Sequence, residues 1–394
     1  MVASEDRYRA FLDERKREGL RRYLLAVAAR EARTIAAEGR SYVNFSSNDY
    51  LGLRFNEALI GRAAAWAEEW GVGSGASRLV TGNLDLFAPI EAKLARLKAK
   101  PAALIMASGF QTNAAALQAL LDRSVLGAEP LVFADRLNHA SMHFGCQAAG
   151  ARQIRYRHAD AAHLGELLAR YQGDDRPKFI LTESVFSMDG DVAPLCDIAR
   201  LARAHQACLI VDDAHATGIL GEGGSGLSGE ADIVIGTFSK ALGSFGGFVA
   251  SSETVRDYLV NRCAGVIYST ALPPPVLGAI DAALDIVPNM EAERTHVANL
   301  AERFRAGARA AGLDTGTSTT QIVPIIAGQP EAALAMSGRL REAGLWASCI
   351  RPPTVPPGTA RLRLAFTAAH REEDVDRLLE VLAAKDARLK AQAV

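Results

Sequence analysis

The feature that most constrains the fold is a regular alternation of short apolar runs with helical patterns in the middle of the chain. The runs AALIM, FILTES, CLIVDDAH, DIVIGTF and GGFVAS are typical of buried strands, and patterns such as APLCDIARLARAHQ are typical of amphipathic helices between them. Strands joined through helices pair in parallel with right-handed crossovers. The sequence therefore predicts an α/β fold with a mostly parallel sheet flanked by helices.

The pattern of apolar runs and helices changes near residue 290. Beyond this point QIVPIIAG, WASCIRPP and ARLRLAF are separated by longer polar helices, which is typical of a smaller α+β domain. At the other end of the chain, apolar residues from Tyr8 to Leu12 at helical spacing predict a helix followed by an arm. The predicted units are an N-terminal helix and arm (1–45), a large domain (46–290) and a small C-terminal domain (291–394).

Composition excludes several classes of function. The chain has 394 residues, 49% of them hydrophobic, and a net charge of −1, so it has no basic field for nucleic acid or a membrane surface. No apolar stretch reaches membrane-spanning length, and the mixed charges of MVASEDRYRA do not match a secretory signal. Five scattered cysteines fit reduced thiols better than a disulfide framework or a zinc site. We expect a cytoplasmic protein without a bound metal.

Polar residues follow three of the predicted strands. Asp212 ends CLIVDD, Lys240 follows DIVIGTFS, and Ser108 and Gly109 follow ALIM. In a parallel sheet these strand ends meet at one edge, where ligands bind. A lysine that forms a Schiff base with pyridoxal phosphate needs an acid beside the pyridine nitrogen and donors for the phosphate. This cofactor fits the three strand ends best.

Each of these residues alone also has an ordinary structural explanation. Asp212 can cap the next turn, Lys240 can extend from a strand end into solvent, and Ser108 can simply cap a helix. His215 strengthens the cofactor interpretation, because it lies three residues after Asp212 and can hydrogen-bond the ring's 3-hydroxyl. A P-loop is excluded, because no GxxxxGK[ST] pattern surrounds Lys240.

Further candidates come from three other segments. His139 in DRLNHASMHFG can stack on an aromatic ring, whereas a metal site with His143 would need a third ligand that is not nearby. Arg361 and Arg363 lie on the same face of a predicted strand; one guanidinium can hold a carboxylate at two points, and the other is expected to be an ordinary surface or ion-pair arginine. Asn48 either assists this contact or shapes a turn.

Five motifs together resemble a known family. The motifs occur in the order found in the α-oxoamine synthases, and the similarity extends from about residue 20 to about 385; they are ESVFSMDGDVAPL, VDDAHATGILGEGGSG, TFSKALGSFGG, IYSTALPPP and IRPPTVPPGTARLRL. The resemblance implies a fold-type I pyridoxal-phosphate enzyme that condenses an amino acid with an acyl thioester and releases carbon dioxide. IYST and IRPPTVP are typical of the branch that joins L-alanine to a pimeloyl group on coenzyme A or a carrier protein. Branches that use glycine or serine stay open, because a single methyl contact separates these amino acids.

The resemblance also implies a role for each matching residue. Lys240 would carry the cofactor, with Asp212 at the pyridine nitrogen and His215 at the 3-hydroxyl. His139 would stack on the ring, completing the catalytic set. Further cofactor contacts would come from Ser187, from the phosphate ligands Gly109, Phe110 and Thr237, and from Thr270 of the neighbouring subunit in a homodimer with shared sites. The amino-acid carboxylate would bind Arg363 and Asn48, and the acyl substrate would lie near Thr354 and Arg21, with Arg22 an equal alternative to Arg21.

Two other classes of protein are less consistent with the sequence. A non-catalytic partner subunit is expected to lose the lysine or its acid, whereas this chain keeps Lys240 and Asp212. A dinucleotide-binding oxidoreductase needs GxGxxG between an early strand and a helix, and the glycines of GVGSGASRLVTG have a different spacing. The chain departs from the common family pattern at Ala76 and Ser239, where glycine is frequent; both residues are small.

Overall fold

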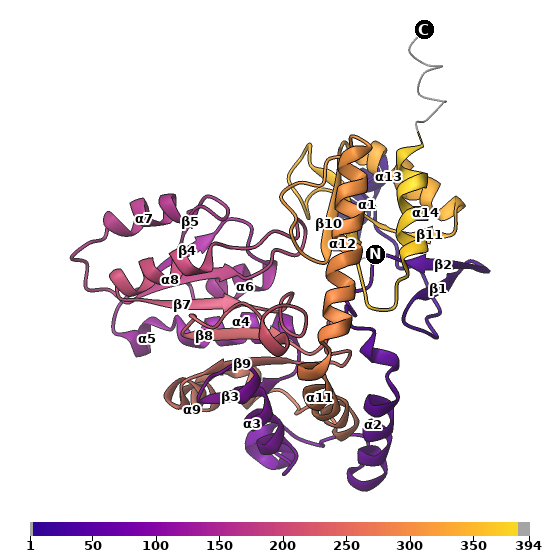
Figure 1. Cartoon of the computed structure of the whole chain (residues 1–394). Coiled ribbons are helices and arrows are strands. Elements are labelled where there is room, and N and C mark those ends of the chain that lie inside the picture. The colour runs from indigo at the N-terminus through magenta and orange to yellow at the C-terminus, as the bar shows by residue number, and fades with distance from the viewer. Residues whose placement is uncertain (1–2, 385–394) are drawn as a thin grey trace.

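The structure, a computed structural model, describes residues 3–384 and contains a larger and a smaller region, each with its own sheets (Figure 1). The larger region is built around a seven-stranded sheet of order β3-β9-β8-β7-β6-β4-β5. Its strands are β3 (Ala102–Met106), β4 (Leu131–Asp135), β5 (Gln153–Tyr156), β6 (Lys178–Glu183), β7 (Ala207–Asp212), β8 (Ile233–Thr237) and β9 (Gly247–Ser251). Residues 1–2 and 385–394 of the predicted terminal units lie outside the described residues.

Strands β4 to β8 pair in parallel, and β9 is antiparallel to both of its neighbours, β3 and β8. The short connection from Thr237 to Gly247 explains the reversal, because parallel neighbours need a crossover of roughly a dozen residues or more. The prediction of an α/β fold with a mostly parallel sheet is confirmed.

Side chains of the sheet alternate between two apolar layers, as the two-residue period of a strand requires. In β4, Phe133 enters one layer, whereas Val132 and Ala134 enter the other. Helices α3 (Phe87–Leu97), α7 (Ala161–Ala169), α8 (Leu195–Ala204) and α11 (Pro274–Ile286) pack into the first layer. Helices α4 (Gly109–Leu120), α6 (Ala140–Ala148), α9 (Glu253–Arg262) and α10 (Ala264–Ile267) pack into the second. Two further helices of this region are α2 (Glu57–Trp70), which packs on α11, and α5 (Arg123–Leu126).

The smaller region combines the C-terminal part of the chain with the N-terminal arm. One sheet has the order β10-β13-β12 and another the order β1-β2-β11. In the second sheet, Val43 lies opposite Leu345, a pairing between distant segments that no local pattern predicts. The strands are β1 (Thr34–Ala37), β2 (Arg40–Asn44), β10 (Ile322–Gly328), β11 (Leu345–Trp346), β12 (Ser348–Ile350) and β13 (Ala360–Ala365), and the helices are α12 (Glu291–Ala310), α13 (Pro330–Glu342) and α14 (Glu372–Ala383).

The predicted N-terminal helix is α1 (Ala3–Arg17). Its apolar side chains Tyr8 and Phe11 are 68% and 53% exposed in the single chain, so this helix does not use them to pack on the rest of the described chain. None of the helices within residues 3–384 has the length and apolar character needed to cross a lipid bilayer.

Candidate active site

A recess of about 220 Å³ opens at the carboxyl ends of β3, β7 and β8, beside the first turns of α4 and α6. This is the sheet edge at which the strand-end argument places a ligand. The predicted site residues that line it are Gly109, Phe110, His139, Asp212, His215, Thr237 and Lys240. Their convergence is observed; the role of each stays a prediction.

Lys240 is the cation of this recess. Burial lowers the pKa of Lys240 to about 8, and the positive charge of Arg363 adds to this effect. The carboxyl group of Asp212 acts in the opposite direction. At neutral pH, roughly a tenth of the molecules carry this side chain as a neutral amine, whereas the neutral fraction of an ordinary lysine is far smaller. The side chain is therefore suited to act as a nucleophile and as a base.

Asp212 is held by two donors. Its Oδ2 accepts a hydrogen bond from Asn113 Nδ2 at 2.6 Å, and its Oδ1 accepts one from the backbone N–H of Ala214 at 3.0 Å. Asn113 was missed in the sequence, although it is a buried amide on a face of α4 otherwise formed by Ala116 and Leu117. An isolated polar residue on a buried helix face is the signal that identifies it.

Glu183 is a second carboxyl group in the recess and was also missed. It ends β6, as Asp212 ends β7, and the two residues lie opposite each other in the parallel pair. Burial and the neighbouring Asp212 raise the pKa of Glu183 well above its usual value. Glu183 stands at the end of the strand pattern FILTES as Asp212 stands at the end of CLIVDD, so the signal for Glu183 was present in the sequence.

His215 is linked to the predicted carboxylate ligands through Tyr50. The Tyr50 hydroxyl lies 2.7 Å from His215 Nδ1 and 3.2 Å from Asn48 Oδ1, and Arg363 Nη2 donates to it at 3.5 Å. Burial and the charges of Lys240 and Arg363 lower the pKa of His215 well below its usual value. His215 is therefore a neutral hydrogen-bonding group.

His139 begins α6 as its N-cap. Its Nδ1 lies 2.7 Å from Ser141 Oγ, which fixes the ring, and burial lowers the pKa of His139. The ring meets Phe110 edge to face, with 6.3 Å between the ring centroids. This side chain is thus held as a neutral aromatic ring at the wall of the recess.

The other predicted residues lie outside the recess. Ser187 and Thr354 line a neighbouring hollow of about 640 Å³. A third hollow of about 570 Å³ is lined by Thr354 together with both Arg21 and Arg22. Arg22 Nη2 donates to Thr354 Oγ1 at 2.9 Å, so of the two arginines it is Arg22 that contacts the threonine. Thr270 is exposed and does not line the recess of its own chain.

Of the two strand arginines, Arg361 forms the expected ion pair, with Asp189, but it is buried rather than on the surface.

The residues of the recess fit pyridoxal phosphate. The first N–H groups of α4 have no partner within the helix and suit a phosphate. Close packing shapes this end: a Cβ on Gly109 would lie 3.2 Å from Thr237 Cβ, and one on Gly247 would lie 2.4 Å from Thr112 Oγ1. Three side chains match the three reactive groups of the cofactor. Lys240 suits its aldehyde, the fixed carboxylate of Asp212 suits its ring nitrogen, and the neutral His215 suits its 3-hydroxyl.

Known proteins resemble the chain over nearly its whole length. The model of the family "Aminotransferase class I and II" matches residues 40–382. A putative 8-amino-7-oxononanoate synthase from Bordetella pertussis is 55% identical over 96% of this chain and 96% of its own. The 8-amino-7-oxononanoate synthase of Gluconacetobacter diazotrophicus is 54% identical over 95% and 96%.

Solved structures agree with these sequence relatives. A structure of SPT with PLP superimposes with a TM-score of 0.89 at 26% identity and covers 98% of both chains. The 8-amino-7-oxononanoate synthase from Francisella tularensis gives a TM-score of 0.76 at 26% identity, covering 90% of this chain and 99% of its own. These comparisons confirm the family resemblance, the fold-type I architecture and the pyridoxal-phosphate cofactor.

Proposed function

Because the chain belongs to the class I and II aminotransferase family, and within it to the family of the 8-amino-7-oxononanoate synthases, we propose that it condenses L-alanine with a pimeloyl thioester. The carboxyl group of alanine leaves as carbon dioxide, and the product is 8-amino-7-oxononanoate, an intermediate of biotin biosynthesis. The observation that carries the proposal is that identity to relatives of this name extends over both regions of the chain.

Each residue of the recess has its own role in the proposed reaction. When bound, pyridoxal phosphate supplies an electron sink for negative charge at the α-carbon of the amino acid. Lys240 would hold the cofactor through Nζ, and the same nitrogen would take the α-proton of the amino acid. Asp212, fixed by Asn113, would keep a proton on the ring nitrogen. Neutral His215 would hydrogen-bond the 3-hydroxyl.

Arg363 is the proposed ligand of the amino-acid carboxylate. Its guanidinium is buried and already tied at one side, because Nε donates to the carbonyl oxygen of Ser187 at 2.5 Å. The contact with Tyr50 brings the Asn48 side chain into the same group. A guanidinium held on one edge has its other N–H groups available for a planar carboxylate.

The acyl thioester is proposed to enter beside Thr354, which lines both neighbouring hollows. Arg21 and Arg22 extend one of these hollows with positive charge, which suits the free carboxylate of a pimeloyl chain. The pimeloyl group arrives on coenzyme A or on a carrier protein.

A homodimer is proposed as the working unit. Thr270 is exposed in the single chain, as expected for a residue that contacts the cofactor phosphate of a neighbouring subunit. Apolar side chains of the N-terminal segment are also exposed; Leu24, for example, is fully open to solvent. A second copy of the chain would cover such surface. The free thiols of all five cysteines suit a reducing compartment, so we place the enzyme in the cytoplasm.

The proposal is tested with purified protein, pyridoxal phosphate and pimeloyl-CoA, offered with L-alanine, glycine or L-serine in turn. We expect 8-amino-7-oxononanoate, identified by mass spectrometry, with L-alanine only. Condensation products from glycine or serine alone would keep the family chemistry and contradict the proposed substrate. The same assay with a pimeloyl carrier protein identifies the natural thioester.

A further inference from the structure

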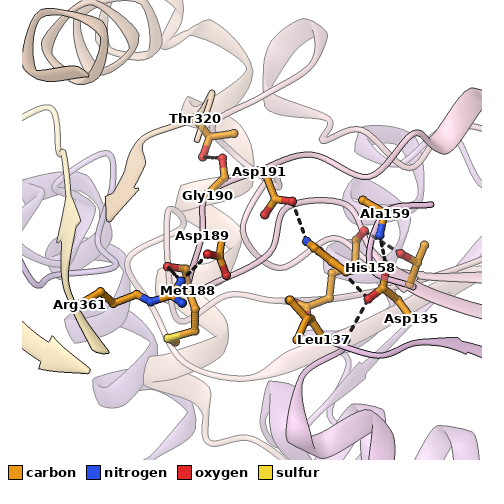
Figure 2. A network of polar contacts seen from close by, with 12 residues as sticks. Asp135, Leu137, His158, Ala159, Met188, Asp189, Gly190, Asp191, Thr320 and Arg361 are labelled. Atoms are coloured by element: carbon orange, nitrogen blue, oxygen red, sulfur yellow. Dashed lines mark hydrogen bonds and ion pairs between the residues drawn. The ribbon is translucent and has the colours of Figure 1, made fainter. Parts of the chain in front are cut away.

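A polar network separate from the Lys240 recess is centred on His158, in the turn between β5 and α7. His158 lies between two buried carboxylates: its Nδ1 is 3.1 Å from Asp135 Oδ1, and its Nε2 is 2.8 Å from Asp191 Oδ2 (Figure 2). Burial lowers the pKa of His158, but the bonds to Asp135 and Asp191 outweigh this effect and raise it to about 10. The ring is therefore an imidazolium that donates from both nitrogens.

On one side, this network fixes the loop that leads to His139. The fully buried Asp135 accepts the backbone N–H of Leu137 at 2.9 Å and that of Ala159 at 2.8 Å. Leu137 precedes His139 by two residues, so Asp135 ties the start of α6 to the turn that carries His158.

On the other side, Asp191 belongs to a compact hairpin that we call the 184–193 loop. Val185 bridges Val192, and the Phe186 N–H donates to the Asp191 carbonyl at 3.0 Å. The Phe186 ring also stands edge-on to the His158 imidazole, with 4.3 Å between centroids. The hairpin is thus held against His158 by a polar contact and an aromatic contact.

The small region holds the opposite side of the same loop. Arg361 pairs with Asp189, and Thr320 Oγ1 donates to the Gly190 carbonyl at 2.8 Å (Figure 2). Arg363 Nε donates to the carbonyl of Ser187. The 184–193 loop therefore lies between the His158 network and the predicted ligand of the amino-acid carboxylate.

We propose that His158 is a positioning residue for the amino-acid substrate: it holds Asp191, and the 184–193 loop in turn orients the Arg363 guanidinium through Ser187. A planar guanidinium binds a carboxylate through two hydrogen bonds only when its plane is aligned with that of the carboxylate. The bond to the Ser187 carbonyl sets that plane, because Nε lies within it. The inference rests on the proposed function in taking Arg363 as the carboxylate ligand.

The first variant is Asp191→Ala, which removes the polar link between His158 and the loop and leaves His158 paired with Asp135. Replacing His158 itself leaves two buried carboxylates without their shared partner, which is expected to destabilise the fold. Asp191→Asn is the conservative variant, because an amide oxygen still accepts the His158 N–H. His163→Ala is the matched control: its Nδ1 accepts the N–H of Arg157 in the same turn, with no contact to the 184–193 loop.

The readouts are the dissociation constant of L-alanine, measured by calorimetry on the cofactor-loaded enzyme, and KM and kcat from the condensation assay. Asp191→Ala is expected to raise the dissociation constant and KM for L-alanine about tenfold, with kcat within about twofold. Asp191→Asn is expected to stay within about threefold of the parent protein, and His163→Ala to leave both constants unchanged. An Asp191→Ala protein that folds and binds L-alanine normally would overturn the proposal.

A double-mutant cycle with Arg363→Lys separates positioning from general stability. In the Arg363→Lys background, Asp191→Ala is expected to weaken L-alanine binding by less than about twofold, because its effect passes through the guanidinium. An undiminished effect in that background would contradict the proposal. If Asp191→Ala does not fold, Asp191→Leu takes its place in the cycle, because leucine is similar in size to aspartate and has no acceptor for the His158 N–H. A parent protein that binds glycine or serine instead of L-alanine would refute the proposed substrate, and the same cycle would then test the positioning role with that amino acid.

Discussion

Glu183 and Asp212 occupy opposed positions at the ends of the neighbouring strands β6 and β7. Burial and the neighbouring Asp212 carboxyl group raise the pKa of Glu183 well above its usual value of 4.5. Asp212, by contrast, accepts two hydrogen bonds, from the Asn113 side chain and from the Ala214 backbone N–H. The recess therefore holds a neutral acid beside a fixed carboxylate, with Lys240 on the same sheet edge.

Glu183→Gln is expected to make the apoenzyme more stable at neutral pH. A raised pKa in the folded state means that the folded protein binds more protons than the unfolded one, so wild-type stability falls as pH rises above the unfolded value of about 4.5. The variant lacks this loss, so in urea unfolding experiments its stability advantage over the parent grows as pH rises above about 4.5, the unfolded-state value. A variant that loses stability relative to the parent as pH rises would contradict the neutral state of Glu183.

Loading of the apoenzyme with pyridoxal phosphate is expected to follow the titration of Lys240. Only the neutral amine reacts with the aldehyde, so the loading rate rises about tenfold per pH unit well below the pKa and levels off above about 8. Stopped-flow absorbance measures this rate. A profile that keeps rising towards pH ~10.4, the value of an ordinary lysine, would show that the recess does not lower the pKa.

Asn113→Ala removes the donor that holds Asp212 Oδ2. We expect the affinity for pyridoxal phosphate to fall about tenfold, because a charge-assisted hydrogen bond is lost and the carboxylate is no longer aimed at the ring. Equilibrium dialysis measures the dissociation constant. Gln118→Ala, on the exposed face of the same helix, is the control and should bind the cofactor like the parent. Equal affinity in both variants would contradict the role given to Asn113.

Gly190→Ala tests the packing of the 184–193 loop. Gly190 has a φ of 69°, and a Cβ there would lie 1.9 Å from the carbonyl oxygen of Ile322, so the loop or β10 must shift. Gly173→Ala is the matched control, because Gly173 has a φ of 82° with no atom within 4 Å of its Cβ. The control is expected to cost about 1–2 kcal/mol of unfolding free energy, and Gly190→Ala clearly more. Equal losses would show that the loop is not tightly packed.

Sequence reasoning recovered the architecture and the residues that stand directly after strands. Lys240, Asp212 and the start of α4 were found because parallel strands deliver their carboxyl ends to one edge, whatever the packing elsewhere. The same logic applied to β6 would have found Glu183. Strand β4 was not identified, although LVFAD is an apolar run of the same length as AALIM; β5 was not identified because QIRY has only two apolar residues among its four.

The remaining residues depend on tertiary contacts that no local pattern contains. Tyr50 meets His215 across a separation of 165 residues, and β2 pairs with β11 from opposite ends of the chain. Ser187 was predicted as a cofactor contact from the family resemblance; it lines a separate hollow, and its carbonyl oxygen accepts a hydrogen bond from Arg363. His158 received no attention in the sequence, because its importance comes from two carboxylates on separate segments.

The most direct test of the proposed function follows labelled carbon dioxide released from carboxyl-labelled L-alanine in the presence of pimeloyl-CoA. We predict one carbon dioxide for each 8-amino-7-oxononanoate formed by the parent protein, and none above background from a folded Lys240→Ala variant. Release without the thioester, or undiminished turnover by Lys240→Ala, would contradict the proposed condensation and the role of Lys240 in it.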